Sequence, residues 1–237
     1  MTDIPVLYED NHLLVVCKPP NLPTQADRSG DPDLLTLLKA DIKQRYGKPG
    51  AVYLGLVHRL DRPVGGLVVF ARTSKAAGRL SAQLRDHDLG RTYLAIVRGV
   101  PPDQARLVDH LVKDEATNTV RVADADAPQA KQAVLNHRCL ARAEGLALLE
   151  VALETGRSHQ IRVQLSHAGH PLWGDARYGN GRPGEQIALW GAALRLTHPT
   201  RGQPLCLTAP PPDRQPWTLF KAAIQAWIHE METDPSA

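Results

Sequence analysis

Short apolar blocks separated by polar breaks run along the first half of the chain, and they predict alternating strands and helices. The apolar run over residues 12–17 ends at Lys18-Pro19-Pro20, where prolines cannot continue a strand ladder. Asp31 and Pro32 suit a helix cap and first turn, and leucines at helical spacing continue to about Tyr46. Three more elements are expected here: a buried strand over 65–71, a helix capped by Ser74, and a strand over 91–97.

In the second half of the chain, runs typical of strands come first, and apolar residues at helical spacing follow. Three such runs between residues 117 and 155 predict an antiparallel meander, followed by a helix from Ser158 to about His167. Residues 174–186 carry Gly, Asn and Pro too densely for a regular element, so a loop is expected. The ending 217–232 predicts a packing helix whose apolar side is Leu219, Ala222, Ala223, Ala226 and Trp227.

Length and composition favour a globular protein of the reducing cytoplasm. At 237 residues and 43% hydrophobic, the chain can bury a core as one large domain or two closely fused halves. Its three cysteines are far apart and form no CxxC pair, which argues against a disulfide framework and a zinc site. No basic segment leads into an apolar run, and no apolar stretch is long enough for a membrane span.

The positive charge is concentrated in two segments. Residues 51–100 hold eight Lys and Arg against three Asp and Glu, and residues 157–201 hold six against two. Arginine dominates both segments and offers a planar fork to phosphate, so an RNA-facing surface is one interpretation. A solvated face with scattered arginines is the other, and charge alone favours it.

The segment Val57-His58-Arg59-Leu60-Asp61-Arg62 places a carboxylate between arginines at the start of a predicted strand. A nearby positive charge lowers the pKa of a carboxylate and orients it, which suits a nucleophile or a base. An ordinary surface ion pair produces the same pattern, so the six residues alone leave both interpretations open.

A second group of polar residues, Glu154 to Arg162, leads from a predicted strand into a predicted helix. Backbone N–H groups at a helix amino terminus favour an anion, and Arg157 and Arg162 could add bonds to phosphate or carboxylate. A capped helix with solvated arginines is the alternative. The Thr-Gly pair before the cap implies a tight turn and favours the functional interpretation.

Taken in order, with RTYLA around Tyr93 between them, these segments resemble the RluA family of pseudouridine synthases. The resemblance covers most of the chain, from VLYEDNHLLVVCKPPNLPT to LRLTHP. HRLD followed at this distance by TGRSHQIR is a specific signature, unlike a lone glycine-rich loop.

The resemblance implies an α+β fold, with a curved mixed, largely antiparallel sheet flanked by helices and an RNA-binding cleft across it. It implies that Asp61 is the catalytic aspartate, that Tyr93 packs on the target base, and that Arg162 pairs with the aspartate. Arg59 would reach into the RNA when the uridine flips out. The other residues expected to contact RNA are Arg62, Arg157, His58 and His159.

The same resemblance sets the expected partners. The substrate would be ribosomal or transfer RNA, with no metal, organic cofactor, membrane or obligatory protein partner, and the protein would act as a monomer. We expect one catalytic domain over residues 1–237, without the small amino-terminal RNA-binding domain that many members carry.

Two short segments depart from the family pattern. Val64-Gly65-Gly66 stands where Thr-Ser-Gly is usual, and Leu189-Trp190-Gly191 where Leu-His-Ala is usual. Neither includes the three residues expected to be catalytic, so they bear on which RNA is accepted more than on the reaction.

Three other functions fit these residues less well. A metal-dependent hydrolase would need ligand spacing that His58, His159, His167 and His170 do not provide. A glycoside hydrolase usually needs two carboxylates flanking the bond, and the motifs contain one aspartate that suits that role. A non-catalytic RNA-binding protein is disfavoured because Asp61, Tyr93 and Arg162 are all present. The residues do not decide whether Asp61 attacks the sugar, deprotonates it or attacks the base.

Overall fold

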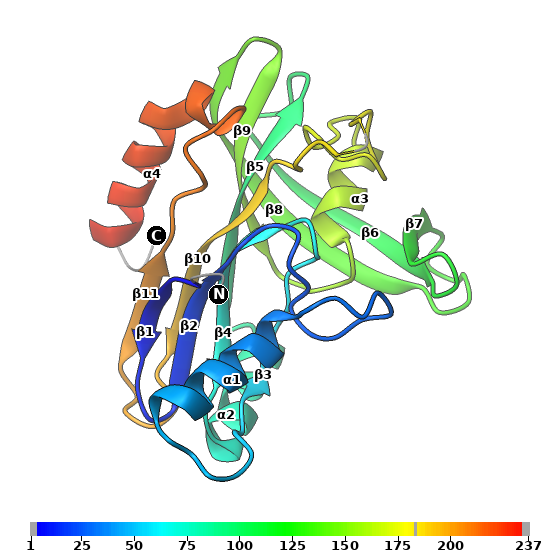
Figure 1. Ribbon diagram of the computed structural model, residues 1–237. Coiled ribbons are helices and arrows are strands. Elements are labelled where there is room, and N and C mark those ends of the chain that lie inside the picture. The colour runs from blue at the N-terminus through cyan, green and yellow to red at the C-terminus, as the bar shows by residue number, and fades with distance from the viewer. Residues whose placement is uncertain (1–3, 183, 234–237) are drawn as a thin grey trace. The chain divides into compact units, whose positions relative to one another are not determined.

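The computed structural model describes residues 4–182 and 184–233 (Figure 1), and the chain divides into two compact units. The first unit is Met1–Gly90 with Gly191–Ala209, and the second is Arg91–Trp190 with Pro210–Ala237. Each unit combines β-strands with helices, and the strands pair mostly antiparallel, so the predicted α+β fold is confirmed. That the units act as one catalytic domain stays a prediction.

The first unit combines a sheet with the helices α1 and α2. Its strands follow the order β1-β2-β4-β10, with β11 beside β10 and β3 beside β4. The strands are β1 Val6–Glu9, β2 Leu13–Lys18, β3 Gly55–Leu56, β4 Gly65–Ala71, β10 Leu189–Thr197 and β11 Pro204–Thr208. The helices are α1 Leu34–Arg45 and α2 Ser74–Arg85.

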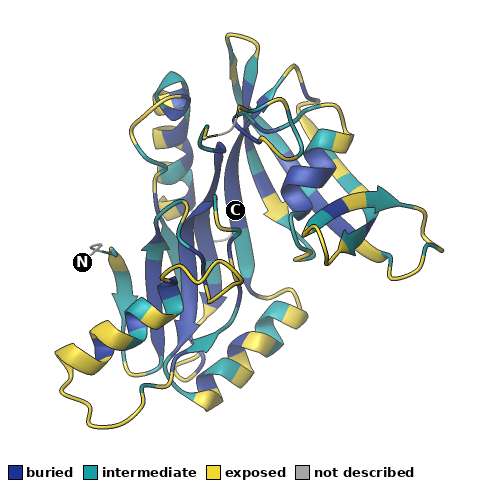
Figure 2. Ribbon diagram, turned by 45° about the vertical axis from the view of Figure 1, so that its right-hand side comes forward, coloured by how far each residue is buried: buried dark blue, intermediate teal, exposed yellow. Residues whose placement is uncertain are grey.

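The core of the first unit lies under α2. Ala76 and Leu80 of this helix pack with Leu13, Val69 and Leu194 from three strands. All seven residues of β4 are buried, as its unbroken apolar run predicts for a central strand. Figure 2 shows the pattern: helices with exposed outer faces beside strands that are mostly buried.

The strands of the second unit pair antiparallel in the order β5-β9-β8-β6-β7. Its strands are β5 Gly90–Arg98, β6 Gln104–Asp114, β7 Thr119–Ala123, β8 Lys131–Ala143 and β9 Leu146–Leu153. Its helices are α3 Gln160–His167, the short 3₁₀ turn η1 Trp217–Phe220, and α4 Lys221–Thr233. Val163 of α3 packs against Leu111, Val120 and Ala133 of the sheet.

Both predicted amino-terminal helix caps are wrong. Helix α1 is capped by Asp33, whose side chain accepts a hydrogen bond from the Thr36 N–H, whereas Asp31 pairs with Arg62. Helix α2 is capped by Thr73, which accepts from the Ala76 N–H, and Ser74 is already its first helical residue. In each case a second capping residue stood one or two positions away, and sequence alone did not separate the two.

The predicted meander and the predicted side of the last helix also need correction. Strand β6 was not predicted, and it lies between β7 and β8, which therefore do not pair with each other. The buried residues of helix α4 are Ile224, Trp227 and Met231. Of the residues predicted to form its apolar side, only Trp227 is among them. Large apolar side chains one turn apart define the buried side better than the small alanines do.

Among the described residues, no helix is long and apolar enough to cross a membrane.

Candidate active site and RNA-contacting residues

Asp61 lies in the first unit, in the turn that leads into β4. The Val64 N–H donates to the Asp61 carbonyl over 3.0 Å, which closes the turn. The preceding residue, Leu60, is buried, and its backbone exchanges hydrogen bonds with the Thr24 hydroxyl over 2.8 and 3.3 Å. Asp61 is thus held on a fixed turn between a buried leucine and a central strand.

A buried lysine that the sequence interpretation missed supports the same turn. The Lys18 ammonium donates to the carbonyls of Pro19, Leu22 and Arg62 over 3.0, 2.7 and 3.2 Å. Burial lowers the pKa of Lys18 to about 7, while the negative charge of Asp61 acts in the opposite direction. Because Arg62 follows Asp61 directly, this lysine anchors the backbone of the aspartate segment.

The other predicted residues of this segment differ in exposure. His58 is only 7% exposed, and its Nε2 accepts from the Val69 N–H over 3.3 Å, so much of its ring serves packing. Arg59 is exposed. Arg62 is also exposed and pairs with Asp31 over 2.5 Å. Contact of these three side chains with RNA stays a prediction, and the two arginines are the more accessible.

Tyr93 lies in the second unit, on β5, where it stands opposite Val151 of β9. Its side chain is 6% exposed, so the ring is largely enclosed. A ring enclosed to this extent keeps a fixed orientation, which a platform for a base requires.

The turn before α3 is held by one glutamine. Gln160 accepts hydrogen bonds from the Thr155 hydroxyl and the Arg157 N–H over 2.8 and 2.9 Å, and it donates to the Val134 carbonyl over 3.0 Å. His159 adopts the left-handed conformation, with φ of 53°, at the amino-terminal cap of the helix. The tight turn expected from Thr-Gly is therefore present and braced against β8.

Arg162 forms a buried bidentate ion pair with Asp175, a residue that the sequence interpretation did not single out. Its Nε and Nη2 donate to the two carboxylate oxygens, each over 2.8 Å. The side chains are 8% and 1% exposed. Burial acts to raise the pKa of Asp175, but hydrogen bonds and the charge of Arg162 outweigh it, so the pKa lies below its ordinary value.

Tyr178 joins two of the predicted residues. Its hydroxyl accepts from the Val120 N–H over 2.9 Å and lies 2.6 Å from Nδ1 of His159. The Arg162 guanidinium carbon lies 5.0 Å from the Tyr178 ring centroid, within cation–π distance.

Within the second unit, the structure therefore brings His159 and Arg162 together around Tyr178 and Asp175. Asp61 belongs to the first unit, and its meeting with Tyr93 and Arg162 stays a prediction. The sequence did carry a signal for the missed residues. Lys18 precedes a Pro-Pro pair, and Asp175 and Tyr178 lie in a loop whose glycines indicated close backbone approach.

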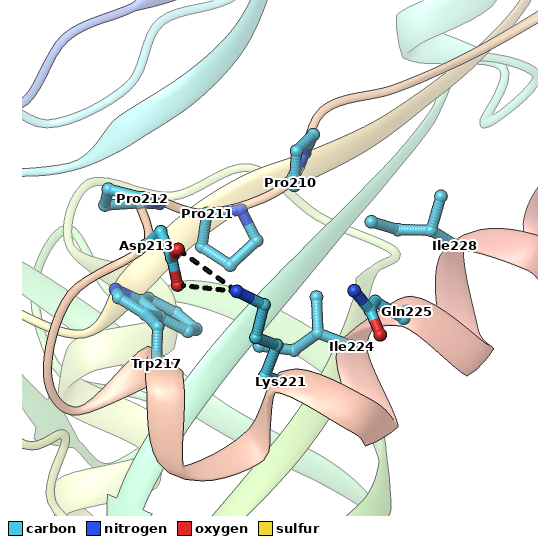
Figure 3. Close-up of a pocket in the computed structure, with 9 residues that line it drawn as sticks. All are labelled: Pro210, Pro211, Pro212, Asp213, Trp217, Lys221, Ile224, Gln225 and Ile228. Carbon is cyan, nitrogen blue, oxygen red and sulfur yellow. Dashed lines mark hydrogen bonds and ion pairs between the residues drawn. The ribbon is translucent and has the colours of Figure 1, made fainter.

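A separate groove of about 220 Å³ lies along α4, beside a run of prolines (Figure 3). The Lys221 ammonium pairs with the Asp213 carboxylate over 3.1 Å at this groove. The lining residues are Pro210, Pro211, Pro212, Asp213, Trp217, Lys221, Ile224, Gln225 and Ile228. It contains none of the predicted site residues.

The three cysteines are free. Within residues 4–182 and 184–233, no group of three or more His, Cys, Asp or Glu side chains could hold a metal ion. Catalysis without a metal stays a prediction.

Comparison with known proteins identifies the family. The sequence model of one family, described as RNA pseudouridylate synthase, matches residues 12–167. A ribosomal large subunit pseudouridine synthase D of Zymomonas mobilis is 36% identical over 92% of this chain and 73% of its own. A tRNA pseudouridine synthase C of Pectobacterium carotovorum is 31% identical over 88% of this chain and 59% of its own.

Solved structures agree at the level of the fold. Human RNA pseudouridylate synthase domain containing 4 superimposes with a TM-score of 0.75 at 21% identity, and each chain is covered to 93%. Human RNA pseudouridylate synthase domain containing 1 gives 0.68 at 22% identity, over 94% of this chain and 95% of its own.

This chain belongs to the RNA pseudouridylate synthase family, whose members isomerise uridine to pseudouridine. The relatives named as synthase D confirm the predicted resemblance to the RluA group.

Proposed function

We propose that this protein converts specific uridines of structured ribosomal or transfer RNA to pseudouridine, with Asp61 as the catalytic carboxylate. Family membership supports the reaction, and the names of the relatives support both classes of RNA. The observation that carries the choice of Asp61 is its position on a braced turn, within the HRLD motif and beside the charge of Lys18.

The reaction explains why a carboxylate and an aromatic ring are needed. The bond from the base nitrogen to the ribose breaks, the base turns, a bond from ribose to carbon 5 forms, and carbon 5 loses its proton. Asp61 would start this sequence by attack or by proton abstraction. The base must first leave its stack in the RNA, and Tyr93 would replace the lost stacking.

Arg162 would orient Asp61 through its guanidinium group. The two hydrogen bonds from Nε and Nη2 to Asp175 would hold that group in a fixed position.

Arg59, Arg62 and Arg157 would bind RNA, since all three are exposed arginines. His58 and His159 belong to the same proposed surface, with smaller accessible areas. We further propose that the enzyme works as a cytoplasmic monomer without metal, organic cofactor or protein partner.

The decisive test is Asp61→Asn, which nearly preserves the shape of the side chain but removes the carboxylate. Release of tritium from carbon 5 of labelled uridine should be abolished. RNA affinity should stay within about tenfold, or roughly 1.4 kcal/mol, because phosphate contacts supply most of it. The exposed Asp88, changed to asparagine in the same way, is the matched control and should react like the wild type.

Two outcomes would contradict the proposal. Near-normal tritium release by Asp61→Asn would exclude Asp61 as the catalytic residue. Tight RNA binding by the wild type without any tritium release, across total ribosomal and transfer RNA, would instead indicate a non-catalytic RNA-binding protein.

A further inference from the structure

Arg91, at the beginning of β5, has a guanidinium group that nothing in the described part of the chain binds. Its side chain is half-buried, and its Nε is buried with no hydrogen-bond partner among residues 4–182 and 184–233. The two Nη groups likewise form no hydrogen bond or ion pair with those residues. A guanidinium carries five N–H donors, so those of Arg91 are available to an acceptor from outside the chain.

The guanidinium of Arg91 is seated against the turn that precedes α3. A Cβ added to Gly156 would lie 2.7 Å from Nη1 and 3.3 Å from Nη2 of Arg91. Gly156 does not have a positive φ, so its backbone does not require glycine. The absence of a side chain there instead leaves the space that the Arg91 fork occupies.

The position of Arg91 relative to Tyr93 follows from strand geometry. Residues two apart on a strand point to the same face, so the Arg91 and Tyr93 side chains share one face of β5. At ~3.3 Å per residue, their backbones are roughly 7 Å apart, which is within the span of one nucleotide. On the other side of Gly156, Arg157 is exposed and donates through its Nε to the Gln132 carbonyl over 2.8 Å.

A half-buried cation without an acceptor has lost part of its hydration and gained nothing in return. An acceptor supplied from outside the chain would compensate for that loss. Phosphate fits the fork of an arginine, and the face shared with Tyr93 is where the RNA chain would run under the proposed function.

We propose that Arg91 binds a backbone phosphate of the substrate RNA, next to the nucleotide whose base stacks on Tyr93. The inference rests on the proposed function, and it adds a phosphate-binding residue beyond the HRLD and TGR motifs. Gly156 is the residue whose missing side chain makes room for it.

The test is a filter-binding titration of full-length protein with substrate RNA at several salt concentrations. Arg91→Gln should weaken binding about tenfold, and the slope of log K against log salt should fall by about 1, as for one lost phosphate contact. KM should rise more than kcat falls. Arg91→Lys should restore part of the affinity, since it keeps the charge but loses the fork.

Arg98 provides a matched control. It lies at the other end of β5, is half-buried, and also has a buried Nε without a partner in the described chain, but it does not adjoin the TGR turn. Arg98→Gln should leave both the affinity and the salt slope unchanged. Equal losses in both variants would overturn the assignment, because binding would then follow total charge rather than position.

Gly156→Ala tests whether the position of the Arg91 guanidinium matters, because it removes no charge. Its methyl group would displace the Arg91 fork, so binding should weaken in the wild-type background. In the Arg91→Gln background the same substitution should have little effect, because the displaced group is no longer there. Additive losses in the double variant would overturn the proposal.

Circular dichroism of each variant separates misfolding from lost binding, and Arg91→Lys and Gly156→Ala carry the test if Arg91→Gln does not fold. Unchanged affinity and slope in a folded Arg91→Gln variant would refute the inference while leaving tritium release by the wild type intact. Failure of the wild type to release tritium would instead refute the proposed function, whatever Arg91 does to binding.

Discussion

A close backbone approach between Gly66 and Gly191 in the first unit predicts different effects of the same substitution at the two glycines. A Cβ on Gly66 would lie 2.3 to 2.6 Å from three backbone atoms of Gly191, and Gly66 has a φ of +122°. A Cβ on Gly191 would meet the Leu67 nitrogen at 3.4 Å and the Leu60 methyl groups at 3.5 Å, which are ordinary contacts. The same methyl group is thus forbidden on one side of the contact and accommodated on the other.

The expected loss in the free energy of unfolding of Gly66→Ala has two contributions. A backbone conformation reserved for glycine costs about 1–3 kcal/mol when another residue adopts it. Overpacking against backbone that cannot rotate away costs a further ~1–3 kcal/mol. We therefore expect a loss of about 4 kcal/mol, a large share of the roughly 5–15 kcal/mol that holds a typical domain together.

Gly191→Ala should change stability by less than about 1 kcal/mol, and it can be stabilising because alanine restricts the unfolded chain more than glycine does. Urea unfolding followed by circular dichroism measures both variants against the wild type. The reasoning fails if Gly66→Ala loses less than about 1 kcal/mol, or if Gly191→Ala loses as much as Gly66→Ala.

Three further outcomes follow from the site. The unfolded chain keeps the Lys18 proton up to about pH 10.5, whereas the folded chain releases it from about pH 7. The cost of burying the charge is therefore largest below pH 7, and wild-type stability relative to Lys18→Met should rise by up to roughly 3 kcal/mol between pH 6.5 and 9.5 in urea titrations. A flat difference would contradict this. Asp175→Asn breaks the buried pair with Arg162, so it should lower the stability of the protein by about 3 kcal/mol and lower kcat. Asp103→Asn breaks an exposed pair and should change stability little. Equal losses of stability in the melting curves of the two variants would count against a special role for the buried pair. Tritium release should be insensitive to EDTA, and loss of activity restored by zinc would refute catalysis without a metal.

The elements that the sequence predicted well are those whose pattern is local. Strand β4 was predicted with its observed bounds because an unbroken apolar run between turn residues permits few alternatives. Strand β6 was missed because its burial alternates weakly and its charged residues resemble a surface loop. Its place between β7 and β8 depends on pairing across the sheet, which no short window of sequence contains.

The features of the candidate site also divide into those that depend on neighbours in sequence and those that depend on the fold. The sequence predicted that Asp61 stands at the start of a strand and that a tight turn at Thr155-Gly156 leads into a helix, since each depends on neighbours in sequence. The pairing of Arg162 with Asp175 and the burial of Lys18 under three carbonyls depend on the fold, so residue type alone did not reveal them. The burial of His58 likewise depends on the fold, and its contact with RNA stays a prediction.

The hydrogen bonds of Asp175 also indicate where the loop that follows it can be altered. Its side chain takes Arg162, and its carbonyl accepts from the N–H groups of Gly179 and Gly181. The loop is therefore pinned to α3 up to Gly181. Insertions placed after that residue should lengthen the loop without moving Arg162, so libraries that vary loop length there would leave the Arg162–Asp175 pair in place.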